Sequence, residues 1–321
     1  MLANGSYGNL TNYAAYYYTD LDKVIITIIM PIVVTIGIIG NIMTIIVIAS
    51  KKCKYTYVNI YLANLAVADT LYLLVAPTWI WNSYVKSPIH NWYDMGEGSD
   101  WFCPFYCFIK GAAIKVALFT ILWLSIDRYM AVCKPLKFRK SGFGIWTKSI
   151  KICGIIWLLG LSWNVSYLAS FSAKFVVFEG LNFTRCTPRN QNLSNILLFV
   201  EVTIVLLAFM VVLFLYTAML ISLRKARVTS ANSTGKKFRS KSEMKIFLTL
   251  VVTVIVYVVC VYPKYLYTVL LTYRITIDIL PMNIFNLMCI INSSVNPLIY
   301  NVLNNTFRRA FRDVYCRCNQ K

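Results

Sequence analysis

The stretch SIDRYMAVCKPL, residues 125–136, places Asp127 and Arg128 side by side directly after the apolar run GAAIKVALFTILWL. With the residues before it, that run is long enough to cross the ~30 Å hydrocarbon core of a bilayer. Hydrophobic residues make up 59% of the 321 residues, which predicts an integral membrane protein. Ionisable residues in or beside a span are costly and mark functional positions, so the charged pair points to a function rather than to packing.

Seven apolar runs have the length of membrane-spanning helices. They cover residues 24–49, 58–83, 104–133, 149–170, 195–223, 244–272 and 279–302. The predicted fold class is therefore an all-α membrane protein, a seven-transmembrane helix bundle. No removable signal peptide is expected before the first span.

Lysine and arginine are concentrated on one side of this bundle. The segments 50–57, 134–151, 224–245 and 303–321 hold 22 of them, whereas the N-terminal tail and the opposite loops hold 6. Basic residues mark the cytoplasmic side, so the N-terminus is predicted to be extracellular and the chain to lie in the plasma membrane. The net charge of +20 follows from this topology, and it favours contact with anionic inner-leaflet lipid rather than with nucleic acid.

The predicted domains follow from this orientation. They are an extracellular tail over 1–23, a transmembrane domain over 24–302, and a cytoplasmic amphipathic helix with a short tail over 303–321. Extracellular sequons for N-glycosylation occur at Asn4, Asn9, Asn182 and Asn192. Residues 16–18 are tyrosines beside Asp20 and Asp22, where sulfation and an unmodified tail are both open.

Two groups of cysteines lie at the ends of the bundle. Cys103, at the outer end of the third span, and Cys186, in the longest outer loop, are the predicted disulfide pair. Cys107, one helical turn deeper, is the alternative partner of Cys186. Cys316 and Cys318 follow the basic amphipathic stretch NTFRRAFRDVY, where palmitoylation and free cytosolic thiols are the two alternatives.

Polar residues recur at defined places along the spans. They are Gly40-Asn41 in the first, Asp69 in the second, Asp127-Arg128-Tyr129 ending the third, Trp157 in the fourth, Pro263 in the sixth and Asn296-Pro297-Leu298-Ile299-Tyr300 in the seventh. In this order they resemble the rhodopsin-like (class A) G-protein-coupled receptors, and the resemblance covers about residues 24–316. It implies that the cytoplasmic amphipathic stretch is a short eighth helix.

The resemblance also implies a coupling site. Arg128 would be held by Asp127 and by Glu243 at the foot of the sixth span, and its release would open a cleft for the G protein. Tyr216 and Tyr300 would then turn inward to support it. Tyr129, Asn296 and Pro297 complete the set of coupling residues.

A sodium ion is the one cofactor that the resemblance implies, and no other metal is expected. Its ligands would be Asn41, Asp69, Asn292, Ser293 and Asn296, whose oxygen atoms suit a hard cation. Ala117 stands where a serine is common in the family. A protonated Asp69 hydrogen-bonded to asparagines is the alternative reading.

The predicted ligand pocket differs from that of amine receptors. Lys110 stands where those receptors carry an aspartate, and a cation there suits a carboxylate, a sulfate or an acidic side chain. Pro77 and Trp79 resemble peptide receptors, chemokine receptors especially, while NIYLANLAVAD and NSSVNPLIYN resemble somatostatin and galanin receptors. The predicted pocket residues are Trp79, Lys110, Glu201, Lys264 and Asn286.

The predicted function is a receptor for an extracellular peptide or small protein, such as a chemokine, that activates a heterotrimeric G protein. A short, basic third inner loop favours the inhibitory class. Arrestin binding is expected to be weak, because Thr306 and Tyr315 are the only hydroxyl residues after Tyr300. The alternatives are a class A receptor for an anionic lipid or small metabolite and, more remotely, a membrane transporter or channel. No enzyme is expected, since no nucleophile and base constellation occurs.

Two departures from the family concern transmission of the signal. The sixth-span motif reads Cys260-Val261-Tyr262-Pro263, with valine in place of a large aromatic ring, and the fifth span has no proline. These losses predict measurable basal activity.

The charged residues Lys115, Glu201 and Lys264 lie inside predicted spans. They should face the bundle interior, and Glu201 is predicted to pair with Lys115 or Lys264. In the alternative, the lysines reach outer water or contact the ligand.

Overall fold

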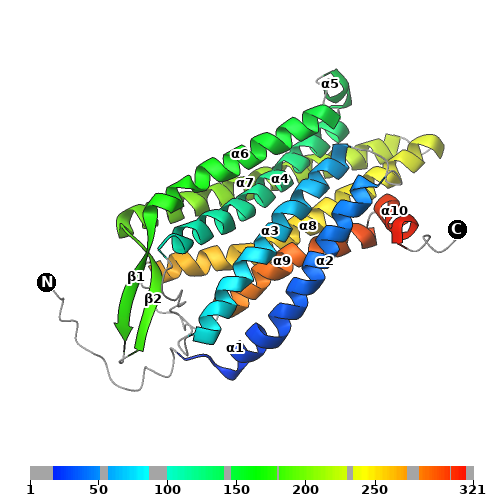
Figure 1. Cartoon of the computed structure of the whole chain (residues 1–321). Helices are drawn as coiled ribbons and strands as arrows, with labels where there is room; N and C mark the ends of the chain where they lie inside the picture. The colour runs from blue at the N-terminus through cyan, green and yellow to red at the C-terminus, as the bar shows by residue number, and fades with distance from the viewer. Residues whose placement is uncertain are drawn as a thin grey trace.

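The computed structural model describes residues 17–50, 57–86, 100–140, 146–178, 181–229, 234–272, 282–303 and 305–315. Within these ranges, seven helices are long and apolar enough to cross a membrane. They are Asp20–Ala49, Val58–Lys86, Phe102–Cys133, Trp146–Ser170, Gln191–Lys225, Phe247–Leu270 and Met282–Leu303. Figure 1 shows them packed along one another in an elongated bundle, which confirms the predicted architecture.

The first span is built from three segments, α1 (Asp20–Val24), η2 (Ile25–Ile29) and α2 (Met30–Ala49). The other spans are α3 (Tyr57–Lys86), α4 (Phe102–Cys133), α6 (Trp146–Ser170), α7 (Gln191–Thr229), α8 (Thr234–Thr272) and α9 (Met282–Leu303). Two shorter helices, α5 (Pro135–Lys140) and α10 (Asn305–Tyr315), lie at the same end of the bundle (Figure 1).

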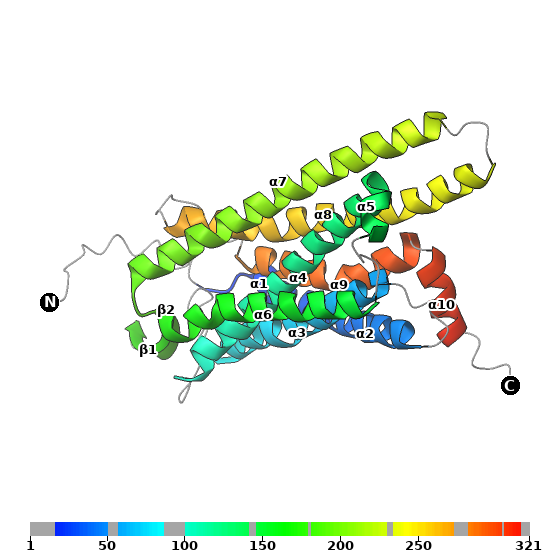
Figure 2. The ribbon, with the colours of Figure 1, turned by 90° about the horizontal axis from the view of Figure 1, so that it is seen from above.

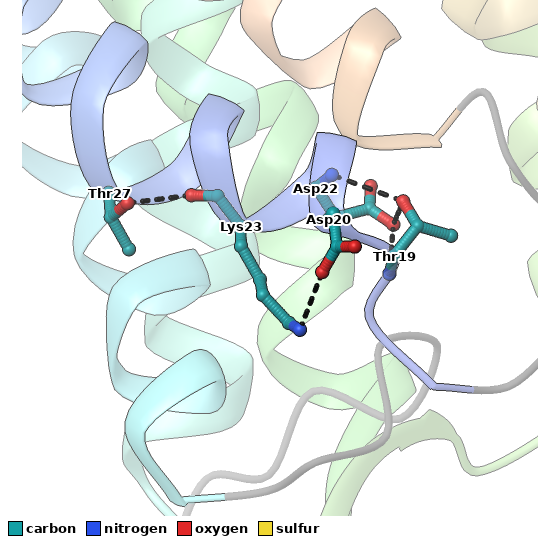
Figure 3. Close-up of polar contacts among 5 residues, drawn as sticks. All are labelled: Thr19, Asp20, Asp22, Lys23 and Thr27. Atoms are coloured by element: carbon teal, nitrogen blue, oxygen red, sulfur yellow. Dashed lines mark hydrogen bonds and ion pairs between the residues drawn. The ribbon is translucent and has the colours of Figure 1, made fainter.

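The first helix begins at Asp20 rather than at the predicted residue 24, because a capping box stabilises its start. The Asp22 amide donates to Thr19 Oγ1 at 3.1 Å, and the Thr19 amide donates to Asp22 Oδ2 at 3.0 Å (Figure 3). Asp22 is buried, and its other carboxylate oxygen accepts a 2.8 Å hydrogen bond from Asn283 of α9. The cap therefore also joins the first span to the seventh.

A π-helical turn over Ile25–Ile29 follows this cap. The Met30 amide donates to the Ile25 carbonyl, so continuing the same pattern would require the amide of Pro31 to donate to the Ile26 carbonyl. Proline has no amide hydrogen. Trp81 of α3 donates instead, with Nε1 2.9 Å from the Ile26 oxygen. The π turn thus ties the first span to the second.

Apolar side chains cover the outside of the bundle and polar side chains lie inside it, as expected for a protein in a bilayer. Large apolar residues on the outer faces of the spans are more than half exposed, among them Ile32, Leu158, Leu207 and Phe214. Such surfaces suit contact with lipid tails. Buried polar residues, including Asn41, Asp69 and Asn296, lie inside the bundle instead. The interior therefore holds the polar groups from which a site can be built.

The structure contains a β-hairpin that the all-α prediction missed. Strands β1 (Phe171–Phe178) and β2 (Leu181–Pro188) pair antiparallel, with Ala173 opposite Cys186. The hairpin lies at the end of the bundle opposite α5 and α10 (Figure 1). Strand pairing depends on partners in register, which hydropathy along single segments does not reveal.

Three spans contain a proline inside an otherwise continuous helix. α3 contains Pro77, α8 contains Pro263 and α9 contains Pro297, each of which removes a backbone hydrogen bond. α7 contains no proline and runs as one continuous helix of 39 residues (Figure 2). The amphipathic α10 buries Phe307 and Ala310, which confirms the predicted eighth helix.

Candidate functional site

Two cavities open at the hairpin end of the bundle. The larger, about 320 Å³, lies among α4, α6, α7, α8, α9 and β1, and its lining includes Lys110, Lys115, Tyr167, Glu201, Val261 and Lys264. The smaller, about 120 Å³, includes Trp79, Tyr106, Lys110, Cys186, Lys264 and Asn286 in its lining. Lys110 and Lys264 line both cavities. All five residues predicted for the ligand pocket are therefore brought together here.

Glu201 of α7 forms an ion pair with Lys115 of α4, as one of the two predicted alternatives required. The side chains of Lys115 and Glu201 are only 8% and 11% exposed. Lys115 Nζ also lies 3.4 Å from Asn164 Oδ1 and 5.8 Å from the centre of the Tyr167 ring, both on α6. The pair therefore joins the third and fifth spans beside the fourth.

Aromatic rings form one wall of the smaller cavity. Trp79 stacks at a tilt on Tyr106, with ring centres 4.1 Å apart. The Tyr106 hydroxyl donates to the Ala76 carbonyl at 3.3 Å, and Lys110 Nζ lies 4.8 Å from the Tyr106 ring centre. Tyr106 was not predicted. It lies one helical turn before Lys110, so the same helix face offered a signal.

The predicted disulfide between Cys103 and Cys186 is present and joins α4 to β2, with Cα atoms 5.5 Å apart. Cys107, the alternative partner, is free. Its Sγ atom nevertheless lies 3.9 Å from Cys186 Sγ, and it lines both cavities. The hairpin is thus fastened to the mouth of the pocket.

A buried polar cluster lies deeper, around Asp69. Asn296 donates to Asp69 at 2.7 Å, and Asn41 donates to the Ser293 carbonyl at 2.9 Å. The side-chain oxygens of Asn41 and Asn296 are buried and accept no hydrogen bond from any described residue. A cavity of about 20 Å³ lies beside Asp69, and its lining includes Asn292, Ser293 and Ala117. Room for one small ion beside the carboxylate of Asp69, the amide of Asn292 and the hydroxyl of Ser293 fits a sodium ion.

The coupling residues gather at the opposite end of α4. Arg128 donates to Asp127 Oδ2 at 2.8 Å, and the Asp127 side chain is fully buried. Two residues earlier, Ser125 shares a 3.0 Å hydrogen bond with the hydroxyl of Tyr216 on α7. The charged pair is therefore part of the bundle core rather than a solvated helix end.

The seventh span completes this end. Tyr300 is buried and packs edge-on against Phe307 of α10, with ring centres 6.2 Å apart. Pro297 lies close to Gly40 of α2, where an added Cβ would meet the proline ring at 3.2 Å. Tyr129 lies below Lys134, whose Nζ is 5.7 Å from its ring centre. Glu243 belongs to α8, but its side chain lies outside the described residues, so its predicted contact with Arg128 stays a prediction.

Comparison with known proteins agrees with this geometry. The family described as "7 transmembrane receptor (rhodopsin family)" matches residues 40–300. This chain belongs to that family. The receptor is accordingly a multi-pass protein of the plasma membrane, and its family consists of signalling receptors rather than enzymes.

Among curated proteins, the receptor is similar to somatostatin receptors of several types. It is 26% identical to the mouse type 2 receptor, an alignment that covers 98% of this chain and 83% of the relative. It is 29% identical to the rat type 4 receptor, over 92% of this chain and 74% of the relative. The rat type 1 receptor is 25% identical, with coverage of 92% and 72%.

Most residues with a predicted modification lie outside the residues that the structure describes. Asn4, Asn9, Cys316 and Cys318 lie outside the described residues, as does the side chain of Asn182. Asn192 is exposed in the first turn of α7, where a glycan has room. Glycosylation and palmitoylation stay predictions.

Tyr18 does not belong to an exposed sulfated arm. Its side chain is buried, and its ring meets Tyr84 edge-on at 5.0 Å. Burial raises the pKa of the Tyr18 phenol to about 12. A charged sulfate would have to displace this packing, whereas Tyr17 is 41% exposed and keeps that option.

Proposed function

We propose that this receptor binds an extracellular peptide or small protein at the two outer cavities and activates a heterotrimeric G protein at the opposite end. The carrying observation is that α4 contributes to both places, with Lys110 in the cavity walls and Arg128 in the buried pair. These residues are 18 positions apart, which corresponds to about 27 Å along a helix. The named relatives favour a peptide, because somatostatin is one.

In this proposal the hairpin end and the N-terminus face outward, in keeping with the basic segments at the other end. The hairpin, fastened by Cys186, would hold the mouth open for a large ligand. Val261 and Lys264 place α8 in the cavity wall, so a ligand there would press on the helix whose foot carries Glu243. Movement of α8 away from α4 would then free Arg128 for the G protein.

Two finer assignments belong to the proposal. A chemokine is one candidate ligand, and a G protein of the inhibitory class is the favoured partner because the segment 224–245 holds 8 basic residues. An anionic lipid or small metabolite is the second candidate ligand, favoured by the three lysines in the larger cavity.

A sodium ion is proposed for the cluster around Asp69. The carboxylate of Asp69 and the side-chain oxygens of Asn41 and Asn296 would hold it, with Asn292 and Ser293 beside them. The ion would balance a buried carboxylate between α3 and α9. It would thereby stabilise the resting arrangement of these helices.

The test is a ligand screen on cells that express the full chain, with G-protein dissociation as the readout. Peptide, chemokine, anionic-lipid and metabolite libraries form separate arms. The proposal expects a signal from the peptide or chemokine arm and none from Arg128→Ala at matched surface expression. A signal from the lipid or metabolite arm alone would contradict the peptide assignment.

A further inference from the structure

The larger cavity carries an imbalance of charge. Three lysines line it, Lys110, Lys115 and Lys264, together with a single acid, Glu201. Glu201 is already engaged, because its carboxylate is ion-paired with Lys115. Two positive charges are left over in the cavity wall.

Within the part of the chain that the structure describes, Lys110 and Lys264 are the two cavity lysines without an acidic partner. Neither makes an ion pair with a described residue, and the Lys110 amino group lies over the face of Tyr106, 4.8 Å from the ring centre. Both side chains are partly buried, and both line the larger and the smaller cavity. Both therefore lie at the boundary between the two spaces.

Two amino groups in the walls of the same cavities repel each other. The repulsion is stronger here than in water, because a half-buried site has a lower effective dielectric constant. An anion placed between them would reverse the sign of the interaction and form charge-assisted hydrogen bonds with each. The site is thus arranged for a negative group that is not supplied by the described part of the chain.

We propose that Lys110 and Lys264 together bind one carboxylate of the ligand, either its C-terminus or an Asp or Glu side chain. This inference rests on the proposed function, because it assigns the chemistry of the ligand at the same pocket. Trp79 and Tyr106 lie in the same small cavity and offer an aromatic wall beside the charges. The ligand should therefore present an apolar or aromatic group next to its acid.

The Lys115–Glu201 pair gives the site its selectivity. If Glu201 were not neutralised, it would offer an ammonium group of a ligand a partner in the same cavity. Because Lys115 occupies it, the cavity opposes amines and favours acids. A positively charged ligand group would meet Lys110 and Lys264 without compensation.

The first test supplies the missing acid within the chain and needs no ligand. The full receptor is purified in lipid nanodiscs, and the unfolding temperatures of Lys264→Glu and Lys264→Gln are compared. The proposal expects the Glu variant to be the more stable, because Lys110 gains a partner, and the advantage to vanish in a Lys110→Gln background. Lys174→Glu and Lys174→Gln, at an exposed position of β1, serve as the matched control pair. If the Lys264 variants do not fold, Lys110→Glu and Lys110→Gln replace them.

The second test uses one peptide library in two forms, with free C-terminal carboxylates and with amides, read out by G-protein dissociation. Active peptides should lose about tenfold or more in potency when the binding acid is removed, and by a similar factor in Lys110→Gln and in Lys264→Gln. Loss on amidation identifies a C-terminal carboxylate, and loss only on Asp→Asn or Glu→Gln identifies a side chain. Equal potency of acid and neutral forms, or a Lys264→Glu no more stable than Lys264→Gln, overturns the inference. Silence of every peptide with the unmodified receptor contradicts the proposed function instead, and the first test then decides on the acid site.

Discussion

Lys115 and Glu201 form a buried ion pair that joins α4 to α7 in the outer half of the receptor, with both side chains nearly shielded from solvent. α7 has no proline to bend it toward its neighbours. The pair therefore supplies a directed contact between the outer halves of two helices whose side chains also share the Ser125–Tyr216 hydrogen bond farther along. Its partner choice follows from helix geometry, since Lys115 is rotated by about 140° from Lys110 and so faces α6 and α7.

Replacing one residue of this pair should lower folding stability more than replacing both residues. Glu201→Gln leaves a buried cation, for which a loss of about 3–5 kcal/mol in folding stability is typical. Adding Lys115→Met should restore much of that loss, whereas adding Lys264→Met should not. Unfolding temperatures in nanodiscs and surface expression measure the difference. Equal stability of the single variant and the matched double variant would contradict the pair's structural role.

The free thiol of Cys107 is placed to form a disulfide with Cys186 when Cys103 is absent. Its sulfur lies 3.9 Å from Cys186 Sγ, so Cys103→Ser should allow Cys107 to pair with Cys186 one turn deeper. Surface expression should therefore fall less in Cys103→Ser than in Cys186→Ser. Adding Cys107→Ser to Cys103→Ser should lower it to the Cys186→Ser level. Peptide mapping under non-reducing conditions identifies the new bond, and its absence from Cys103→Ser would refute the prediction.

Gly37 marks a close approach of the first span to the second and seventh. A Cβ there would lie 2.7 Å from Leu73 Cδ1 and 2.7 Å from Ser294 Cβ. Small residues permit such contacts between membrane helices, so Gly37→Ala should cost about 1–3 kcal/mol through overpacking. Gly154→Ala is the matched control, because a Cβ there meets no atom within 4 Å. A Gly37 variant as stable as the Gly154 variant would show that the helices can move apart freely.

Basal signalling should be measurable, because Val261 leaves space where the family usually has a large ring. Val261 lines both the large outer cavity and the small cavity beside Asp69. A change of about 1.4 kcal/mol shifts a two-state equilibrium tenfold, so a modest loss of packing suffices. Val261→Trp should lower ligand-free G-protein dissociation, and Glu243→Ala should raise it. Basal signalling equal to mock-transfected cells at matched expression would count against this account.

Hydropathy and charge predict much of this receptor, because bilayer thickness and the cost of buried charge act on single segments. The seven spans, the positions of Asp69 and Arg128, and the inward direction of Lys115 follow from length and helix rotation alone. The hairpin does not, since Ala173 meets Cys186 only through strand pairing. The burial of Tyr18 was missed as well, because it depends on contact with Tyr84, a residue far along the chain.

The pairing of Lys264 could not be predicted from the sequence. Its depth and charge marked it as an interior residue, but whether it would reach Glu201 depended on the path of α8 around Pro263. In the structure Glu201 pairs with Lys115, and Lys264 lines the same small cavity as Lys110. Side-chain pairing across three helices is set by packing, which no single segment encodes.

A ligand in the outer cavities is expected to activate a G protein through Arg128 at the far end of α4. The most direct measurement is nucleotide exchange on a purified heterotrimeric G protein, with the receptor in nanodiscs and a peptide identified in the screen. We predict that the peptide accelerates exchange with the unmodified receptor, and that Arg128→Ala abolishes the acceleration while peptide binding persists. Acceleration by Arg128→Ala equal to that of the unmodified receptor, or binding of the peptide without any exchange, would contradict it.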